Sequence, residues 1–174
     1  FTMTTCLSRS IRRNRPWQCC MHCNRLPPDA WPPITNTATE FLPMLKEVDG
    51  VIIQPRHRAT CHCGAVELEL DLPDGIVDPR RCDCSICRRK GAVVASVPLS
   101  GIHVIKGAEY LTLYQFNTHT AKHYFCSRCG IYTHHQRRSN PEQYGYNVGC
   151  LEGVNPLAIE GVPTNDGVNH PADR

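Results

Sequence analysis

Apolar and polar side chains alternate with a period of two in the segment AVELELDL, which spans residues 65–72. The apolar positions are Val66, Leu68, Leu70 and Leu72. Successive side chains of a strand point to opposite faces, so this alternation predicts a half-buried β-strand with one solvated face. The sequence LPDG, at residues 72–75, predicts the turn that ends this strand.

Six further short segments have strand character, and Gly, Pro, Asn or Ser separate them. They span residues 91–99, 101–107, 110–117, 121–126, 131–136 and 144–151. One helical turn is predicted at SICRRK, residues 85–90. Because the connections are too short for helical crossovers, we predict a mainly β fold of antiparallel strands. The tail after Cys150 is rich in Gly, Pro and Asn and is expected to lie across the surface.

The composition is that of one globular domain. The chain has 174 residues, of which 41% are hydrophobic and 20% charged, and these values exclude wholesale disorder. No apolar run approaches the roughly 18 residues that a membrane helix needs, and no signal-peptide pattern is present. We therefore expect a soluble, cytoplasmic protein with no membrane partner.

The basic charge is concentrated at the start of the chain. Residues 1–43 hold five arginines against Asp29 and Glu40, which accounts for the whole formal charge of +3. The remainder is neutral, so no nucleic-acid partner is expected, since that binding needs clustered Lys and Arg. We assign residues 1–50 to a poorly ordered, extraneous N-terminal extension and residues 51–174 to the functional domain.

Seven of the twelve cysteines form three closely spaced groups in this domain. The groups are Cys61 with Cys63, then Cys82, Cys84 and Cys87, then Cys126 with Cys129. In a reducing compartment, thiolates at such spacing are more typical of metal ligands than of disulfides. Tetrahedral sulfur coordination favours zinc, with an iron–sulfur cluster as the second choice. Cys150 stands alone among apolar residues and is predicted to be a buried packing residue.

The first and third groups share one feature, a glycine directly after the last cysteine, at Gly64 and Gly130. Such a glycine lets the backbone turn so that amides can point at sulfur, so we pair these two groups into one four-thiolate site. A closed site of this kind is structural. The second group is then left with three thiolates and an open fourth position, the arrangement of a catalytic zinc.

Two alternatives to an open catalytic site remain for the second group. A histidine would complete a second closed site, the candidates being His119, His123, His134 and His135. A redox dithiol of Cys84 and Cys87 is less favoured, because Cys82 in the same turn indicates chelation. His134 and His135 would face opposite sides of a strand, so at most one of them can face a given site.

Together these motifs resemble a known family. They are CHCGAVELEL at 61–70, CDCSICRRKGA at 82–92, FCSRCGIYTHH at 125–135 and NVGCLEG at 147–153. Over residues 57–160 the sequence resembles the glutathione-dependent formaldehyde-activating enzyme family, which includes the centromere protein V type proteins. The resemblance implies a β-tent of small antiparallel sheets that carries two zinc ions.

The resemblance also implies roles for the cysteines. Matching the family's structural zinc ligands are Cys61, Cys63, Cys126 and Cys129, and matching its catalytic zinc ligands are Cys82, Cys84 and Cys87. The implied activity condenses glutathione with formaldehyde to S-hydroxymethylglutathione, formally a carbon–sulfur lyase reaction run in reverse. Its partners would be a small thiol and an aldehyde. The alternatives are an enzyme for a different thiol or aldehyde, and a non-catalytic zinc module that binds glutathione or a protein partner.

The implied chemistry assigns candidate roles to residues near these motifs. Coordination to zinc would deprotonate a thiol whose pKa is about 8.5 when free. Candidate clamps for the two carboxylates of glutathione are Arg88, Arg89 and Lys90, which stand directly after the second cysteine group. His119 and His123, just before the third group, are the candidate acid–base residues.

Overall fold

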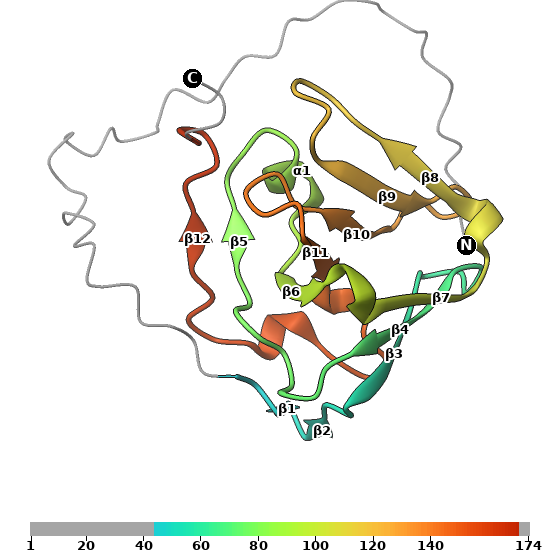
Figure 1. Ribbon diagram of the computed structural model, residues 1–174. Helices are drawn as coiled ribbons and strands as arrows, with labels where there is room; N and C mark the ends of the chain where they lie inside the picture. The colour runs from blue at the N-terminus through green and yellow to red at the C-terminus, as the bar shows by residue number, and fades with distance from the viewer. Residues whose placement is uncertain (1–43, 171–174) are drawn as a thin grey trace, which may run out of the picture. The chain divides into compact units, whose positions relative to one another are not determined.

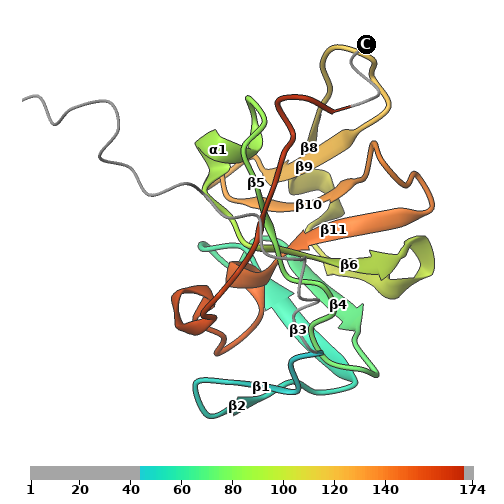
Figure 2. The ribbon, with the colours of Figure 1, turned by 90° about the vertical axis from the view of Figure 1, so that its left-hand side faces the viewer.

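The computed structural model of the chain describes residues 44–170, in which short strands form four sheets (Figure 1). The expected mainly β fold of small antiparallel sheets is confirmed for this part of the chain. Figure 2 shows the two larger sheets one above the other, with the single α-helix to one side. Among the described residues, no helix is long and apolar enough to cross a membrane.

The three-stranded sheet has the order β3-β4-β7, and both neighbouring pairs are antiparallel. Its strands are β3 (Arg56–Thr60), β4 (Glu67–Asp71) and β7 (Ile102–Lys106). The predicted alternation is confirmed, because the four apolar side chains at 66, 68, 70 and 72 are at most 3% exposed. On the solvated face, Arg58 Nη2 lies 3.0 Å from Glu67 Oε2 across β3 and β4. Such exposed ion pairs contribute under about 1 kcal/mol, so burial of the apolar face stabilises this sheet.

The five-stranded sheet has the order β6-β11-β10-β9-β8, with antiparallel pairing throughout. Its strands are β6 (Val94–Pro98), β8 (Leu111–Tyr114), β9 (Lys122–Cys126), β10 (Tyr132–Gln136) and β11 (Gln143–Asn147). All five lie within or overlap segments predicted as strands. Strands β8 to β11 follow one another as a meander, the arrangement expected from their short connections.

A two-stranded hairpin precedes the larger sheets. It consists of β1 (Glu47–Val48) and β2 (Val51–Ile52), joined through Asp49 and Gly50, both with positive φ. Strand β1 lies within residues 1–50, which the sequence assigned to the extension, so ordered structure begins before residue 51. For residues 1–43, the prediction of a poorly ordered extension lies outside the described residues.

One small sheet differs from the expectation of antiparallel strands. Strand β5 (Arg81–Cys82) pairs in parallel with β12 (Thr164–Asn165), and the two lie side by side in Figure 1. A parallel pair needs a long connection, and here most of the domain lies between the two strands. The C-terminal tail, expected only to lie across the surface, therefore takes part in a sheet.

The single α-helix within residues 44–170 is one turn long. It is α1 (Cys87–Lys90), as predicted at SICRRK, and it ends at Gly91, whose φ of 64° is the left-handed conformation that suits glycine. The described residues also hold four short 3₁₀ helices: η1 (Leu99–Gly101), η2 (Ala108–Tyr110), η3 (Val148–Cys150) and η4 (Pro156–Ala158).

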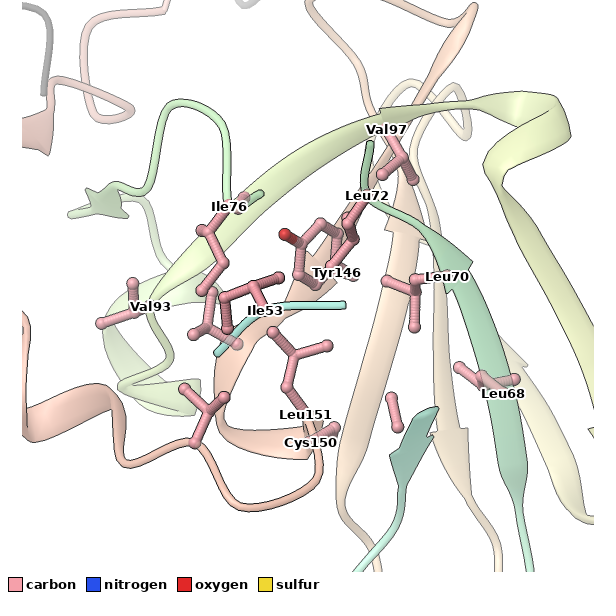
Figure 3. Close-up of a cluster of buried hydrophobic side chains, with 14 of the residues drawn as sticks. Ile53, Leu68, Leu70, Leu72, Ile76, Val93, Val97, Tyr146, Cys150 and Leu151 are labelled. Atoms are coloured by element: carbon pink, nitrogen blue, oxygen red, sulfur yellow. The ribbon is translucent and has the colours of Figure 1, made fainter. Parts of the chain in front are cut away.

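The core lies between the apolar face of the three-stranded sheet and the β6–β11 edge of the five-stranded sheet (Figure 3). It is built mainly from aliphatic side chains, with Tyr146 of β11 pointing into their midst. Cys150 is 5% exposed within this cluster, which confirms its interpretation as a packing residue. Burial raises the pKa of the Cys150 thiol to about 12, so this thiol stays protonated and unreactive.

Candidate metal centre and substrate cavity

Four cysteines predicted to form one site are brought together in the structure. Cys61 and Cys63 lie in the turn between β3 and β4, Cys126 ends β9, and Cys129 lies in the turn after it. We call these four residues the closed cysteine group. Their sulfur atoms all lie within 4.8 Å of one another, with Cys61 to Cys63 at 3.6 Å and Cys63 to Cys126 at 3.8 Å. Four sulfurs about 2.3 Å from one zinc ion would be roughly 3.8 Å apart, so the group fits a tetrahedral ion.

Both turns of the closed cysteine group depend on their glycines. Gly64 has a φ of 70° and Gly130 a φ of 73°, which is the left-handed region. The Gly64 amide donates to the Cys61 carbonyl at 3.0 Å, and the Gly130 amide donates to the Cys126 carbonyl at 2.8 Å. Each turn thus folds its pair of thiols toward the other pair, as the glycine positions predicted.

Backbone amides also stabilise thiolates in the closed cysteine group. Val66 N–H donates to Cys61 Sγ at 3.3 Å. Burial raises the pKa of Cys129, but hydrogen bonds from the Ile131 and Cys63 amides and from neighbouring thiols outweigh this effect and lower it to about 6. Two of the four thiols, Cys61 and Cys129, thus have lowered pKa values, and thiolates suit a cation.

The second cysteine group comes from one short stretch of chain. Cys82 ends β5, Cys84 lies in the following loop, and Cys87 begins α1. We call these three residues the open cysteine group. Their sulfur atoms lie within 4.8 Å of one another, and among the described residues no histidine nitrogen or carboxylate joins them at that distance. The second closed site completed by a histidine is therefore not formed by residues 44–170.

The open cysteine group holds a negative charge at its centre. Hydrogen bonds from Cys82 and Cys87 lower the pKa of Cys84 well below its usual value. Hydrogen bonds with Cys82 and Cys84 raise the pKa of Cys87. One thiolate is thus shared among three sulfurs, and a soft cation would release the remaining thiol protons. Three thiolates from one protein leave a tetrahedral ion one free position.

The C-terminal segment packs directly over the open cysteine group. The Asp83 carboxylate accepts hydrogen bonds from the backbone amides of Gly167 at 2.7 Å and Val168 at 3.2 Å. Any side chain at position 167 would overlap Cys82 Sγ and Cys84 Cβ, so this position requires glycine. The sequence analysis missed this contact, because neither Asp83 nor the tail shows a pattern that links residues 84 positions apart.

A cavity of about 400 Å³ lies beside the open cysteine group. Its walls include all three of these cysteines, and its basic side chains are Arg80, Arg81, Arg88, Arg137 and Arg138. Asp166 is the single acidic residue among the described residues that line it. We call this space the basic cavity. The chain after residue 43 is neutral overall, but several of its arginines are concentrated around this cavity, where a ligand would enter.

Of the three residues predicted to bind the carboxylates of glutathione, one lines the basic cavity and two do not. Arg88 lines it, whereas Arg89 donates to the Ser85 carbonyl. Lys90 Nζ lies 2.9 Å from His123 Nδ1 and 3.6 Å from the centre of the Tyr132 ring. Arg89 and Lys90 do not line the basic cavity, because the turn of α1 directs them elsewhere. Arg80 and Arg137 were missed, since each stands apart from the cysteine motifs in the sequence.

The histidines separate into two environments. His123 and His135 line the basic cavity with their rings stacked 5.1 Å apart, whereas His134 stacks on Tyr124 at 4.6 Å. The expectation that His134 and His135 face opposite sides is confirmed. His119 is exposed in the β8–β9 loop and does not line the cavity. Of the two candidate acid–base residues, His123 is the one that meets the cavity.

Lys90 determines the hydrogen-bonding state of His123. Burial, followed by the positive charge of Lys90, lowers the pKa of His123 to about 4, so its ring is neutral at pH 7. An ammonium group has only protons to donate, so His123 Nδ1 must accept from Lys90 Nζ. The proton of the neutral ring is then on Nε2. Nε2 is thus the proton donor of this ring, on a side chain that lines the basic cavity.

Taken together, the small sheets, the closed cysteine group and the open group beside a cavity define a mainly β protein with two cysteine groups that could each hold a metal ion. The sequence profile of the family "Glutathione-dependent formaldehyde-activating enzyme" matches residues 56–161. The chain belongs to this family.

Individual relatives agree with this assignment. A protein of Halomonas elongata that carries the family's name is 38% identical over 78 residues, which cover 40% of this chain and 49% of that protein. The chain thus matches about half the length of this curated relative. A crystal structure of a Rhodobacter sphaeroides protein is 64% identical, with a TM-score of 0.60, and the match covers 62% of this chain and 99% of that one.

Proposed function

We propose that this protein is a zinc-dependent enzyme of the carbon–sulfur lyase type. It condenses glutathione, or a similar thiol, with formaldehyde to S-hydroxymethylglutathione. The observation that carries the proposal is the open cysteine group, whose three sulfurs lie together in the wall of a 400 Å³ basic cavity. Cavities of about 300–1,000 Å³ suit small-molecule ligands, and arginines suit a thiol that carries carboxylates.

The two cysteine groups have different roles in this proposal. The closed group holds a structural zinc, and the open group, Cys82, Cys84 and Cys87, holds a catalytic one. When bound at the open group, zinc would lower the pKa of a substrate thiol from about 8.5, so that more of it is the nucleophilic thiolate. The chain's own residues must then place formaldehyde and supply one proton.

His123 is the proposed proton donor. When the thiolate sulfur forms a bond to the formaldehyde carbon, the electron pair of the C=O bond moves to oxygen, which then needs a proton. His123 lines the cavity, and its Nε2 holds the proton of the neutral ring. Lys90 Nζ lies 2.9 Å from His123 Nδ1, so it can give the ring a proton at Nδ1 as Nε2 loses one. Burial lowers the pKa of Lys90 to about 8, so this ammonium remains mostly charged at pH 7 and can give up a proton.

The test is the rate of condensation in solution. The full chain, loaded with zinc, is added to glutathione and formaldehyde, and adduct formation is followed against the uncatalysed reaction. Cys84→Ser should remove the acceleration, because it breaks the open group. Cys150→Ala is the matched control, since this thiol is buried in the core and should keep the wild-type rate. A wild-type rate equal to the uncatalysed one would overturn the proposal.

A further inference from the structure

We propose that Arg80 and Arg137, held together by Ser96, form a carboxylate-binding subsite in the basic cavity. This subsite would select thiols that carry a carboxylate away from the sulfur. The inference rests on the proposed function for the identity of the thiol, but its evidence is independent of the cysteines. The evidence is the geometry and the charge balance of the two guanidinium groups.

Both arginines converge on one hydroxyl oxygen. Arg80 precedes β5, Arg137 follows β10, and Ser96 lies in the middle of β6. Arg137 Nη1 donates to Ser96 Oγ at 2.8 Å, and Arg80 Nη2 donates to the same atom. Both arginines also line the basic cavity. The pair is therefore assembled from three separate elements at the cavity wall.

The backbone and burial make this pair rigid. Arg80 exchanges two backbone hydrogen bonds with Val94, at 2.9 and 2.8 Å, and is 8% exposed. Arg137 Nη1 also donates to Gln143 Oε1 at 2.9 Å. Side chains fixed in this way lose little freedom when a ligand binds, which favours affinity.

The pair carries a positive charge that the described residues do not balance. Arg80 is ion-paired with Asp78. Arg137 contacts neutral groups, namely Ser96, Gln143 and Ser139, and has no carboxylate partner among residues 44–170. The two guanidinium groups therefore have one carboxylate partner between them, the Asp78 that pairs with Arg80, and a second anion would relieve their repulsion.

A ligand carboxylate is the anion that fits best. A guanidinium presents parallel N–H groups that match the two oxygens of a carboxylate. The same cavity contains the open cysteine group, so a ligand held at both places has a thiol at one end and a carboxylate at the other. Glutathione has this form, whereas 2-mercaptoethanol has the thiol alone.

The experiment compares these two thiols on one variant. Arg137→Gln keeps hydrogen-bonding groups and removes the charge. We expect its KM for glutathione to rise on the order of tenfold to a hundredfold, as for loss of a charge-assisted contact, while the rate with 2-mercaptoethanol stays unchanged. Arg137→Lys keeps the charge but lacks the forked guanidinium, so its KM for glutathione should lie between those of the wild type and Arg137→Gln. Arg56→Gln, on the solvated face of β3, is the control and should match wild type.

Binding of S-methylglutathione separates this inference from the proposed function. This probe has both carboxylates and no free thiol, so calorimetry reports the subsite without any reaction. Wild-type binding that Arg137→Gln weakens at least tenfold supports the subsite, even if no condensation is catalysed. Unchanged binding in the variant, or equal losses with glutathione and 2-mercaptoethanol, would overturn it.

Discussion

The closed and open cysteine groups use the same side chain but differ in how the fold supplies it. The closed group draws on two turns more than sixty residues apart, which adjoin the two larger sheets, and its Cys61 and Cys126 are at most 2% exposed. The open group comes from residues 82–87 alone and is half-buried beside a cavity. A metal in the closed group would connect distant parts of the chain, whereas a metal in the open group would connect only residues 82–87. The stability of the fold should therefore depend on the closed group, and the reactivity on the open group.

Cys126→Ser should have the largest effect. A structural zinc contributes about 10 kcal/mol or more in small zinc domains, and a whole domain is typically stable by about 5–15 kcal/mol. We expect the variant to lose its cooperative thermal transition, measured by circular dichroism. Cys150→Ala, also a buried cysteine, should retain that transition. A wild-type melting curve for Cys126→Ser would show that the closed group is not needed for folding.

Cys82→Ser should have the second-largest effect, because it should remove the metal of the open cysteine group alone. The metal content should fall from two zinc ions per chain to one, because the remaining ion is held by the closed group. The melting temperature should change by less than about 5 °C, which for a domain of this size corresponds to roughly 1–2 kcal/mol. Metal analysis and a thermal melt measure both values. Loss of both ions from this variant would contradict the independence of the two groups.

His123→Gln should lower the catalytic rate and leave metal content unchanged. A positioned acid typically contributes about 10²–10⁴-fold, and we expect a fall in kcat of at least 10²-fold with KM for glutathione little altered. His119→Gln is the matched control, because that exposed side chain lies outside the cavity lining. Equal kcat values for the two variants would remove His123 from the mechanism.

Gly167→Ala should have the smallest effect of the four. The added methyl group would overlap Cys82 Sγ, and overpacking of this kind costs about 1–3 kcal/mol. The cost should appear as weaker zinc retention at the open group, measured by competition with a chelator, while the closed group keeps its ion. Val168→Ala, at the exposed neighbouring position, should behave as wild type. If both variants lose zinc equally, the contact at Gly167 does not support the site.

Local patterns predicted the strands and the two cysteine groups well. The alternation at 65–72 and the glycines after Cys63 and Cys129 are short-range signals, and a strand or a turn responds to them directly. The pairing of Cys61 and Cys63 with Cys126 and Cys129 could be predicted, because a glycine directly follows the last cysteine of both groups.

Long-range contacts without a motif were not predictable. The parallel pairing of β5 with β12 depends on where the tail returns after the whole domain has folded. The meeting of Arg80 with Arg137 depends on the register of β6 between them. Conversely, Arg89 and Lys90 were favoured because of sequence proximity to the cysteines, but one turn of α1 carries them away from the cavity.

The hydrogen bonds from Gly167 and Val168 to Asp83 make residues 165–168 part of the cavity wall. A shortened chain that stops at residue 162 would keep both larger sheets and both cysteine groups, yet its cavity would open toward solvent on one side. Such a chain would lack the β12 partner of β5 and the contacts of Asp83 with the tail, and it would bind its ligand poorly. For expression and labelling work, residues 163–170 should therefore be kept in the expressed chain.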